Sequence, residues 1–349
     1  MRSNHGAYPH ERAFLVAVGL IASAVIATAW QQAQPPAPRE LLRSVAQISD
    51  GEWAALERGA AVAKVLVTDP RDITVAGSVR IAAARELLVD RYRDFEALKR
   101  SALVLDVGRF ATPPQVADVM ALPIEDYDLD LRDCRSGDCR VRLGEKEIAR
   151  FHRDVDWRAA DWRERSRGVW REVLAGYAAA YARDGRKALP TFANKPEHLD
   201  VAAELSLLVD RFAFVGDYSS AFLSYMREFA GAAPDGGSDV LYWTKEDFGV
   251  RPVMRLQHQV IHRTPQAIII ATNQVYADHY LDASLTMTLA IDAPLSDGRA
   301  GFYMVVVSRS RTRSLAGLLR ALVRSTVRDR SREGLLKILQ ATKFSLERG

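Results

Sequence analysis

The stretch AIIIAT at residues 267–272, followed by SLTMTLAI at 284–291 and FYMVVVSR at 302–309, decides the fold. These segments are rich in Val, Ile, Thr and aromatic residues, a composition typical of β-strands. Two further strands are expected at 240–244 and 252–263, and turn residues at 265–266 and 296–298 separate neighbouring strands. A series of strands joined by short turns predicts an antiparallel sheet.

A long amphipathic helix is expected at residues 314–346, directly after the strand series. Its leucines and valines recur at helical spacing, which gives the helix one apolar side. A sheet with one apolar face and a helix with one apolar side bury both surfaces by packing together. The sequence therefore predicts an α+β fold in which a curved antiparallel sheet packs on a long C-terminal helix.

The first half of the chain is expected to add to this sheet and to carry a helical insertion. Strand patterns occupy 61–68, 73–82 and 102–110, with a helix expected at 83–101. Four helices are then expected within residues 145–232, which we interpret as an insertion beside the sheet. Residues 30–49 are interpreted as a linker with a leading helix, and 50–349 as a single composite domain.

The composition excludes several classes of protein. The chain has 349 residues, of which 48% are hydrophobic and 26% charged, a mixture that disfavours long disorder, collagen-like repeats and polytopic membrane proteins. The net charge is only +4, but residues 309–349 contain eleven Lys and Arg against three Asp and Glu. A basic amphipathic helix can rest on an anionic membrane surface, for which the candidates are Arg320, Arg324 and Arg328. The alternative is an ordinary solvated helix face, and a nucleic acid partner is not expected.

The amino terminus predicts export. Arg2 and Arg12 flank a polar start, and an apolar run from Ala13 to Trp30 follows, with small residues near its end. This pattern is typical of a signal peptide at 1–29, while an inner-membrane anchor formed by 13–30 is the alternative. Either interpretation predicts a periplasmic or other extracytoplasmic protein.

The two cysteines agree with export. Cys134 and Cys139 enclose a turn sequence, Arg-Ser-Gly-Asp, and the residues on both sides alternate between apolar and polar. The alternation predicts a β-hairpin or a short bent ribbon. An oxidising compartment would allow the pair to close as a structural disulfide, and we expect that bond. A redox-active pair usually has two intervening residues, so that alternative is disfavoured.

The histidines at positions 258 and 262 are a candidate pair with helical i, i+4 spacing. On a helix both rings would point the same way, as metal ligands do. The flanking Val, Ile and Thr residues favour a strand, on which His258 and His262 would lie about 13 Å apart, too far for one ion. We therefore expect no metal site and no cofactor, and we keep His258 as a candidate ligand-binding residue.

Polar and aromatic residues gather between 276 and 282, which makes this segment the best local candidate for a site. A Tyr, an Asp and a His close together could bind a polar head group or transfer a proton. The alternative is a hydrogen-bonded connection between two strands. The candidate ligand-binding residues here are Tyr276, Asp278, His279 and Tyr280.

The predicted order of elements resembles the helix-grip fold of START-like and polyketide-cyclase-like proteins. Several phrases also resemble a group of uncharacterised exported bacterial proteins, namely DCRSGDC at 133–139, LYWTKEDFG at 241–249, YADHY at 276–280 and SRSR at 308–311. The resemblance to the exported group implies no catalytic residues. The helix-grip resemblance implies a long apolar cavity between the sheet and the C-terminal helix.

Three functions follow as hypotheses. The first is an exported protein that binds an apolar or amphipathic small molecule, such as a lipid, between the sheet and the terminal helix. The second is an envelope enzyme that uses the segment from Tyr276 to His279. The third is a structural or interaction protein of the cell envelope with a protein partner. The chain has no Gly-x-Ser-x-Gly elbow, zinc-protease helix or phosphate loop, so its catalytic residues are unknown and we favour a non-catalytic function.

Overall fold

The computed structural model describes residues 35–69, 71–94, 103–234, 237–247, 251–313 and 320–348. Side chains are described in these ranges except at 67–69 and 320–327. The chain divides into two units, residues 1–35 and 36–349, and the account below concerns the second. The predicted signal peptide or anchor lies outside the described residues.

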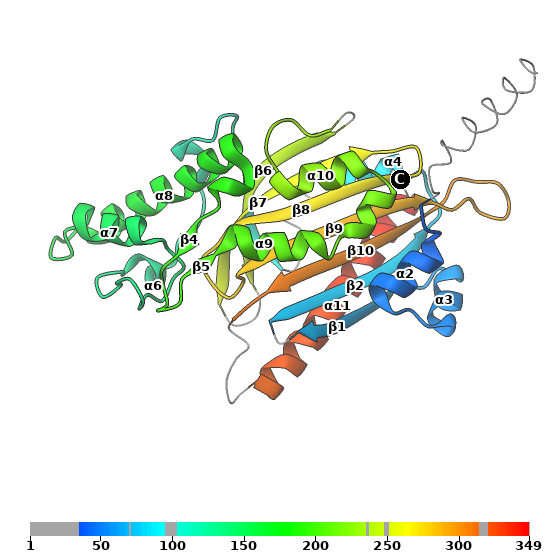
Figure 1. The fold of residues 1–349 in the computed structure, drawn as a ribbon, viewed down its shortest axis with the longest axis horizontal. Helices are drawn as coiled ribbons and strands as arrows, with labels where there is room; N and C mark the ends of the chain where they lie inside the picture. Colours follow the sequence, from blue (N-terminus) through cyan, green and yellow to red (C-terminus); the bar gives the residue numbers. More distant parts are fainter. Residues whose placement is uncertain are drawn as a thin grey trace, which may run out of the picture. The chain divides into compact units, whose positions relative to one another are not determined.

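One antiparallel sheet of eight strands forms the centre of the described unit (Figure 1). The sheet is open, with β1 and β3 at its two edges, and its strand order is β1-β2-β10-β9-β8-β7-β6-β3. This confirms the predicted α+β fold with an antiparallel sheet and a long C-terminal helix. The strands are β1 (Val62–Asp69), β2 (Asp72–Ile81), β3 (Val104–Arg109), β6 (Ser238–Asp247), β7 (Pro252–Arg263), β8 (Ala267–Ala277), β9 (Ala283–Asp292) and β10 (Phe302–Arg311).

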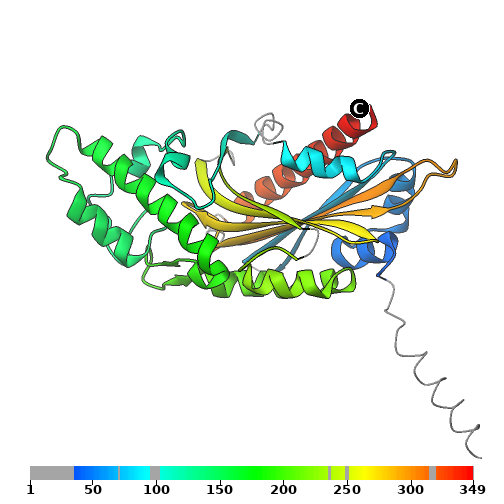
Figure 2. The same ribbon diagram turned by 90° about the horizontal axis from the view of Figure 1, so that it is seen from above.

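The C-terminal helix α11 (Arg320–Arg348) lies across one face of the sheet, together with α4 (Glu86–Arg93) (Figure 2). Leu335 and Leu339 of α11 are buried in a core with strand residues such as Ile81 and Met304. The helix approaches β2 closely at Gly77, where an added Cβ would lie 3.0 and 3.1 Å from the tips of these two leucines. Glycine at this position therefore allows the close packing that the sequence predicted in outline.

The opposite face of the sheet is covered by several helices, and the larger core lies there (Figure 2). Aliphatic residues of β8, β9 and β10 point into this core, among them Ile269, Leu285 and Val305. Helix α2 lies within residues 30–49, where a leading helix was expected, and α3 begins with a capping box between Ser49 and Glu52. The covering helices are α2 (Pro38–Ala46), α3 (Asp50–Glu57), α8 (Trp162–Asp184), α9 (Val201–Asp210) and α10 (Ser220–Glu228).

The helical insertion expected at 145–232, together with the elements before it, extends beyond one end of the sheet (Figure 1). Trp170 of α8 is fully buried there, and its ring nitrogen donates a hydrogen bond to the carbonyl of Asp128, 2.8 Å away. The other elements of this half are η1 (Val116–Val119), α6 (Asp126–Leu129), α7 (Glu145–Asp154), η2 (Gly185–Ala188), the short pair β4 (Thr191–Phe192) and β5 (Leu199–Asp200), and η3 (Ala213–Asp217).

One expectation from the sequence was wrong in detail, and another is only partly covered by the described residues. The predicted hairpin around the cysteines is an irregular loop with one bridge, Arg135 to Asp138, and its upstream arm contains the one-turn helix α6. A single helical turn is too short to show helical periodicity. The alternation of apolar and polar residues before Cys134 was therefore misread as a strand. Of the helix expected at 83–101, the described part is α4, which begins at Glu86 and ends at Arg93, and residues 95–101 lie outside the described residues. None of the described helices has the length and apolar character needed to cross a membrane.

Candidate functional site

A cleft of about 390 Å³ lies where the ends of α8 and α10 meet β6 and β7. Its walls are largely apolar and aromatic, and its volume falls in the range of about 300–1,000 Å³ typical of small-molecule sites. The apolar and aromatic lining includes Phe110, Pro113, Pro114, Leu241 and Phe229, and the polar lining includes Tyr181, Tyr225, Asp239 and His258.

A chain of four polar side chains ends in this cleft. The Asn273 amide lies 3.0 Å from the Tyr181 hydroxyl, which lies 3.1 Å from Nδ1 of His258. Nε2 of His258 lies 3.1 Å from the carboxylate of Asp239. Each contact is satisfied when Asn273 donates to Tyr181, Tyr181 donates to His258, and His258 donates from Nε2 to Asp239. This direction, which we assign from the network, corresponds to a neutral imidazole.

The four residues differ in their exposure. Tyr181, His258 and Asn273 are buried, whereas the side chain of Asp239 is 53% exposed. The hydrogen bond from His258 holds the pKa of the Asp239 carboxyl below its usual value, although burial acts in the opposite direction. The cleft therefore contains a carboxylate that is negatively charged at neutral pH and is held in place by buried groups.

His262 does not share the surroundings of His258. Both residues lie on β7, as the sequence predicted, but His262 stacks on Phe222 at a ring distance of 5.0 Å. Its Nε2 lies 3.1 Å from the hydroxyl of Ser219, which also caps α10. Burial lowers the pKa of His262.

The segment from Tyr276 to Tyr280 divides between the core and a second polar cluster. Tyr276 is the penultimate residue of β8 and is fully buried, where its hydroxyl donates to the carbonyl of Arg142 at 2.9 Å. Its ring packs against Tyr177 and Phe192. Tyr280, with a φ of 57°, is only partly buried. Tyr276 therefore supports the core, and it does not line the cleft.

Asp278 and His279 meet Asp128 of α6 below the surface. Nε2 of His279 lies 2.9 Å from Oδ1 of Asp128 and 3.8 Å from Oδ2 of Asp278. Both carboxylates are fully buried. Burial is the largest cause that raises the pKa of Asp278 to about 7; the nearby Asp128 raises it further, whereas His279 and Lys245 lower it. An Asp–His pair of this kind can hold a proton or a cation.

The predicted disulfide is present between Cys134 and Cys139. The loop that it closes lies against α7, because His152 Nε2 is 2.5 Å from the carbonyl of Cys134. Both cysteines belong to the larger core. The bond thus has a structural position, as the spacing of the cysteines indicated.

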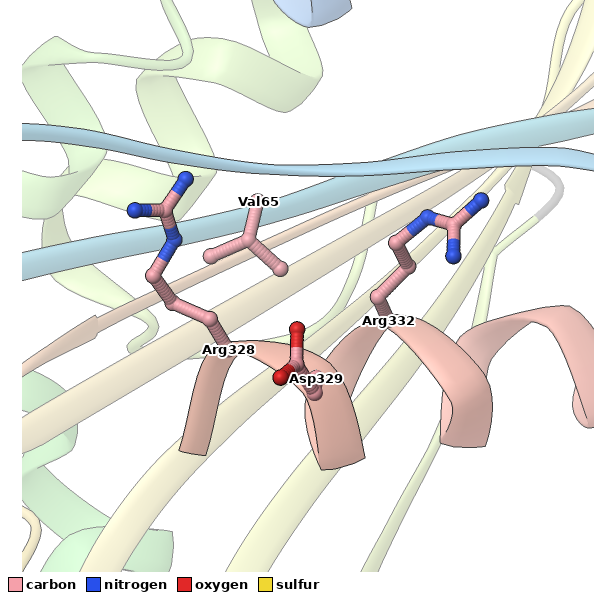
Figure 3. A pocket seen from close by; sticks show the side chains of 4 residues that line it. All are labelled: Val65, Arg328, Asp329 and Arg332. Carbon is pink, nitrogen blue, oxygen red and sulfur yellow. The ribbon is translucent and has the colours of Figure 1, made fainter. Parts of the chain in front are cut away.

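The membrane-surface candidates lie at the start of α11. Arg328 is exposed, whereas Arg320 and Arg324 belong to the part of the helix whose side chains are not described. Arg328 and Arg332 extend from α11 toward β1 on either side of Asp329 (Figure 3). With Val65 they line a small hollow of about 160 Å³, and Arg332 donates to the carbonyl of Ala63 at 3.1 Å. Arg332 thus donates a hydrogen bond to one backbone carbonyl of the edge strand β1.

Sequence reasoning found His258, Asp278 and His279 but missed their partners. Tyr181, Asp239 and Asn273 carry no motif, and Tyr181 is 77 positions from His258. Asp128 lay in a segment predicted to be extended. Long-range contacts of this kind leave no spacing signal in a single sequence.

The chain was compared with protein families, with curated proteins and with solved structures, and no match was found in any of the three.

Proposed function

We propose that this protein binds a small amphipathic molecule with a positively charged or hydrogen-donating head in the cleft between α8, α10, β6 and β7. The observation that carries the proposal is the chain from Asn273 to Asp239, which ends in one oriented carboxylate inside an aromatic cleft. An ordinary polar surface would not need three buried groups to orient one carboxylate.

The charge and the walls of the cleft together define the class of ligand. Asp239 is ionised at neutral pH and faces the cleft, so it attracts a cation or an N–H donor. Tyr181, Tyr225 and Phe229 line the cleft, and aromatic rings attract cations. The basic group at the rim, Arg183, is already paired with Asp184 at 2.7 Å. An amine with an apolar body fits this combination better than a carboxylate.

This proposal keeps ligand binding, as the sequence suggested, but places it on the face of the sheet opposite α11. Side chains such as Leu335, Leu339 and Phe302 form a packed core between α11 and the sheet. We further propose that the protein is exported, and the disulfide supports this because such bonds persist in oxidising compartments.

The test uses three ligands of matched shape: 2-phenylethylamine, 2-phenylethanol and phenylacetate. Binding to the full chain is measured by isothermal titration calorimetry at pH 7.5. We expect the amine to bind more tightly than the alcohol, and the alcohol more tightly than the carboxylate. Equal binding of all three, or tightest binding of phenylacetate, would contradict the proposal.

Variants locate the site. Asp239→Asn removes the charge but keeps the shape, so we expect it to abolish the preference for the amine over the alcohol. Asp210→Asn is the matched control, because Asp210 is an exposed residue of α9 outside the cleft. Circular dichroism and the melting temperature show whether each variant is folded. A folded Asp239→Asn protein that keeps the amine preference would place the site elsewhere.

A further inference from the structure

Three side chains of the metal-ligating types converge away from the cleft. Asp128 comes from α6, whereas Asp278 and His279 follow β8, and one ligand atom from each lies within 4.8 Å of the other two. We propose that Asp128, Asp278 and His279 bind a divalent transition-metal ion of the Zn²⁺ or Mn²⁺ type. The proposal concerns a second site and does not depend on the ligand proposed for the cleft.

The distances are close to those of a coordination shell. Ligand atoms at about 2.0–2.2 Å from one metal ion lie roughly 3.0–3.6 Å from each other. Nε2 of His279 is 2.9 Å from Oδ1 of Asp128 and 3.8 Å from Oδ2 of Asp278. These two distances lie on either side of that range, and the three ligand atoms all lie within 4.8 Å of one another.

Two carboxylate oxygens of this cluster are buried without a hydrogen-bond partner among the described residues. They are Oδ2 of Asp128 and Oδ2 of Asp278, and both residues have no exposed surface. A buried charged oxygen that makes no hydrogen bond carries a large desolvation cost. Both oxygens belong to the cluster in which His279 Nε2 lies, so a cation bound there would compensate them.

Neighbouring groups hold the ligands in position. Oδ1 of Asp278 accepts a hydrogen bond from the backbone N–H of Met254 at 3.0 Å, which leaves Oδ2 for the cluster. Trp170 donates to the backbone carbonyl of Asp128 at 2.8 Å and so fixes α6. Such outer contacts orient the ligands of metal sites.

The charges near the site favour a divalent ion. Asp128, Asp278 and Glu125 are acidic. The basic groups nearby that oppose a cation are Lys245 and Arg142, and Arg142 is paired with Asp282. Lys245 is 1% exposed, makes no hydrogen bond among the described residues, and lies 3.6 Å from Glu125. A divalent cation bound there would offset the repulsion between the buried carboxylates of Asp128 and Asp278.

The mixed donor set selects the class of metal. One imidazole nitrogen and two carboxylate oxygens suit Zn²⁺ and Mn²⁺, whereas Ca²⁺ and Mg²⁺ prefer oxygen ligands alone. No metal was expected from the sequence, because His258 and His262 would lie too far apart on a strand to share one ion. Asp128 and His279, 151 positions apart, were not considered together.

The test measures metal binding directly. The full chain is stripped with EDTA, dialysed and titrated with Co²⁺, a spectroscopic substitute for Zn²⁺, and then with Zn²⁺, Mn²⁺, Mg²⁺ and Ca²⁺ in calorimetry. We expect one equivalent of Co²⁺ to produce a visible absorption band that Zn²⁺ abolishes, and Mg²⁺ and Ca²⁺ to bind more weakly than Zn²⁺ and Mn²⁺. Absence of a Co²⁺ band together with absence of binding heat for Zn²⁺ and Mn²⁺ would overturn the proposal, as would tighter binding of Mg²⁺ or Ca²⁺.

Variants then assign the ligands. Asp128→Asn and His279→Gln are expected to weaken Zn²⁺ binding at least about tenfold. His262→Gln is the control, because it removes a buried histidine outside the cluster, and it should bind Zn²⁺ as the unmodified chain does. If folded Asp128→Asn and His279→Gln proteins bind Zn²⁺ normally, the site is not this cluster. Should either variant fail to fold, the Co²⁺ and Zn²⁺ titrations of the unmodified chain still decide the proposal.

Discussion

Nε2 of His279 lies 2.9 Å from the carboxylate of Asp128, although 151 positions separate the two residues in the chain. This contact ties the one-turn helix α6 to the end of β8. Asp128→Ala removes the acceptor and leaves the buried His279 without it, so we expect a loss of about 1–3 kcal/mol in the free energy of unfolding. Urea unfolding in the presence of EDTA measures it. Asp128→Asn keeps an acceptor oxygen and should lose less; equal losses would contradict this account.

The close approach of α11 to β2 makes Gly77 sensitive to substitution. In Gly77→Ala the new Cβ would lie 2.5 Å from the carbonyl oxygen of Val62 and about 3 Å from two leucines of α11. We expect a loss of about 1–3 kcal/mol in the free energy of unfolding, measured with urea. Gly168→Ala is the control, because Gly168 lies within α8 and its Cβ would meet nothing within 4 Å. The control should gain up to about 1 kcal/mol; a Gly77→Ala protein as stable as the control would contradict the packing argument.

The disulfide closes a short loop, which sets the size of its effect. The cysteines are five positions apart, and the entropy of closing so short a loop corresponds to about 2 kcal/mol. We expect the Cys134→Ser, Cys139→Ser double variant to lose about that much stability. Dithiothreitol should lower the melting temperature of the unmodified chain and leave that of the double variant unchanged. An effect of the reductant on both proteins would show that it does not act through this bond.

The burial of His262 predicts a dependence of stability on pH. Burial lowers the pKa of His262 below its usual value of 6.5, so the unfolded chain takes up a proton at a higher pH than the folded chain. The resulting stability is present above pH 6.5 and is lost as the pH falls through the lower folded pKa. Between pH 7.5 and 5.5 we expect the unmodified chain to lose more free energy of unfolding than His262→Gln. Equal losses, measured by urea unfolding at both pH values, would count against this role.

The sequence predicted the sheet more successfully than the sites. The strands from 240 to 309 and the terminal helix each bury one face. Burial of one face gives a regular spacing of apolar residues, which can be recognised in the sequence. His258 and His279 were found because polar residues stand out within or beside apolar strands. Their partners Asp239, Tyr181 and Asp128 come from other elements, and only the folded topology brings them near. The one-turn helix α6 was missed because four residues cannot display a helical period.

The position of β10 between β2 and β9 affects how the chain can fold during synthesis. Thr74 of β2 is paired with Arg309 of β10, 235 positions later, so the hairpin of β1 and β2 has no place in the sheet until nearly the whole chain has been made. Contacts of such long range slow folding and expose unpaired strand edges in the meantime. A truncation before residue 302 would consequently remove the last strand and also detach the N-terminal hairpin from the rest of the sheet.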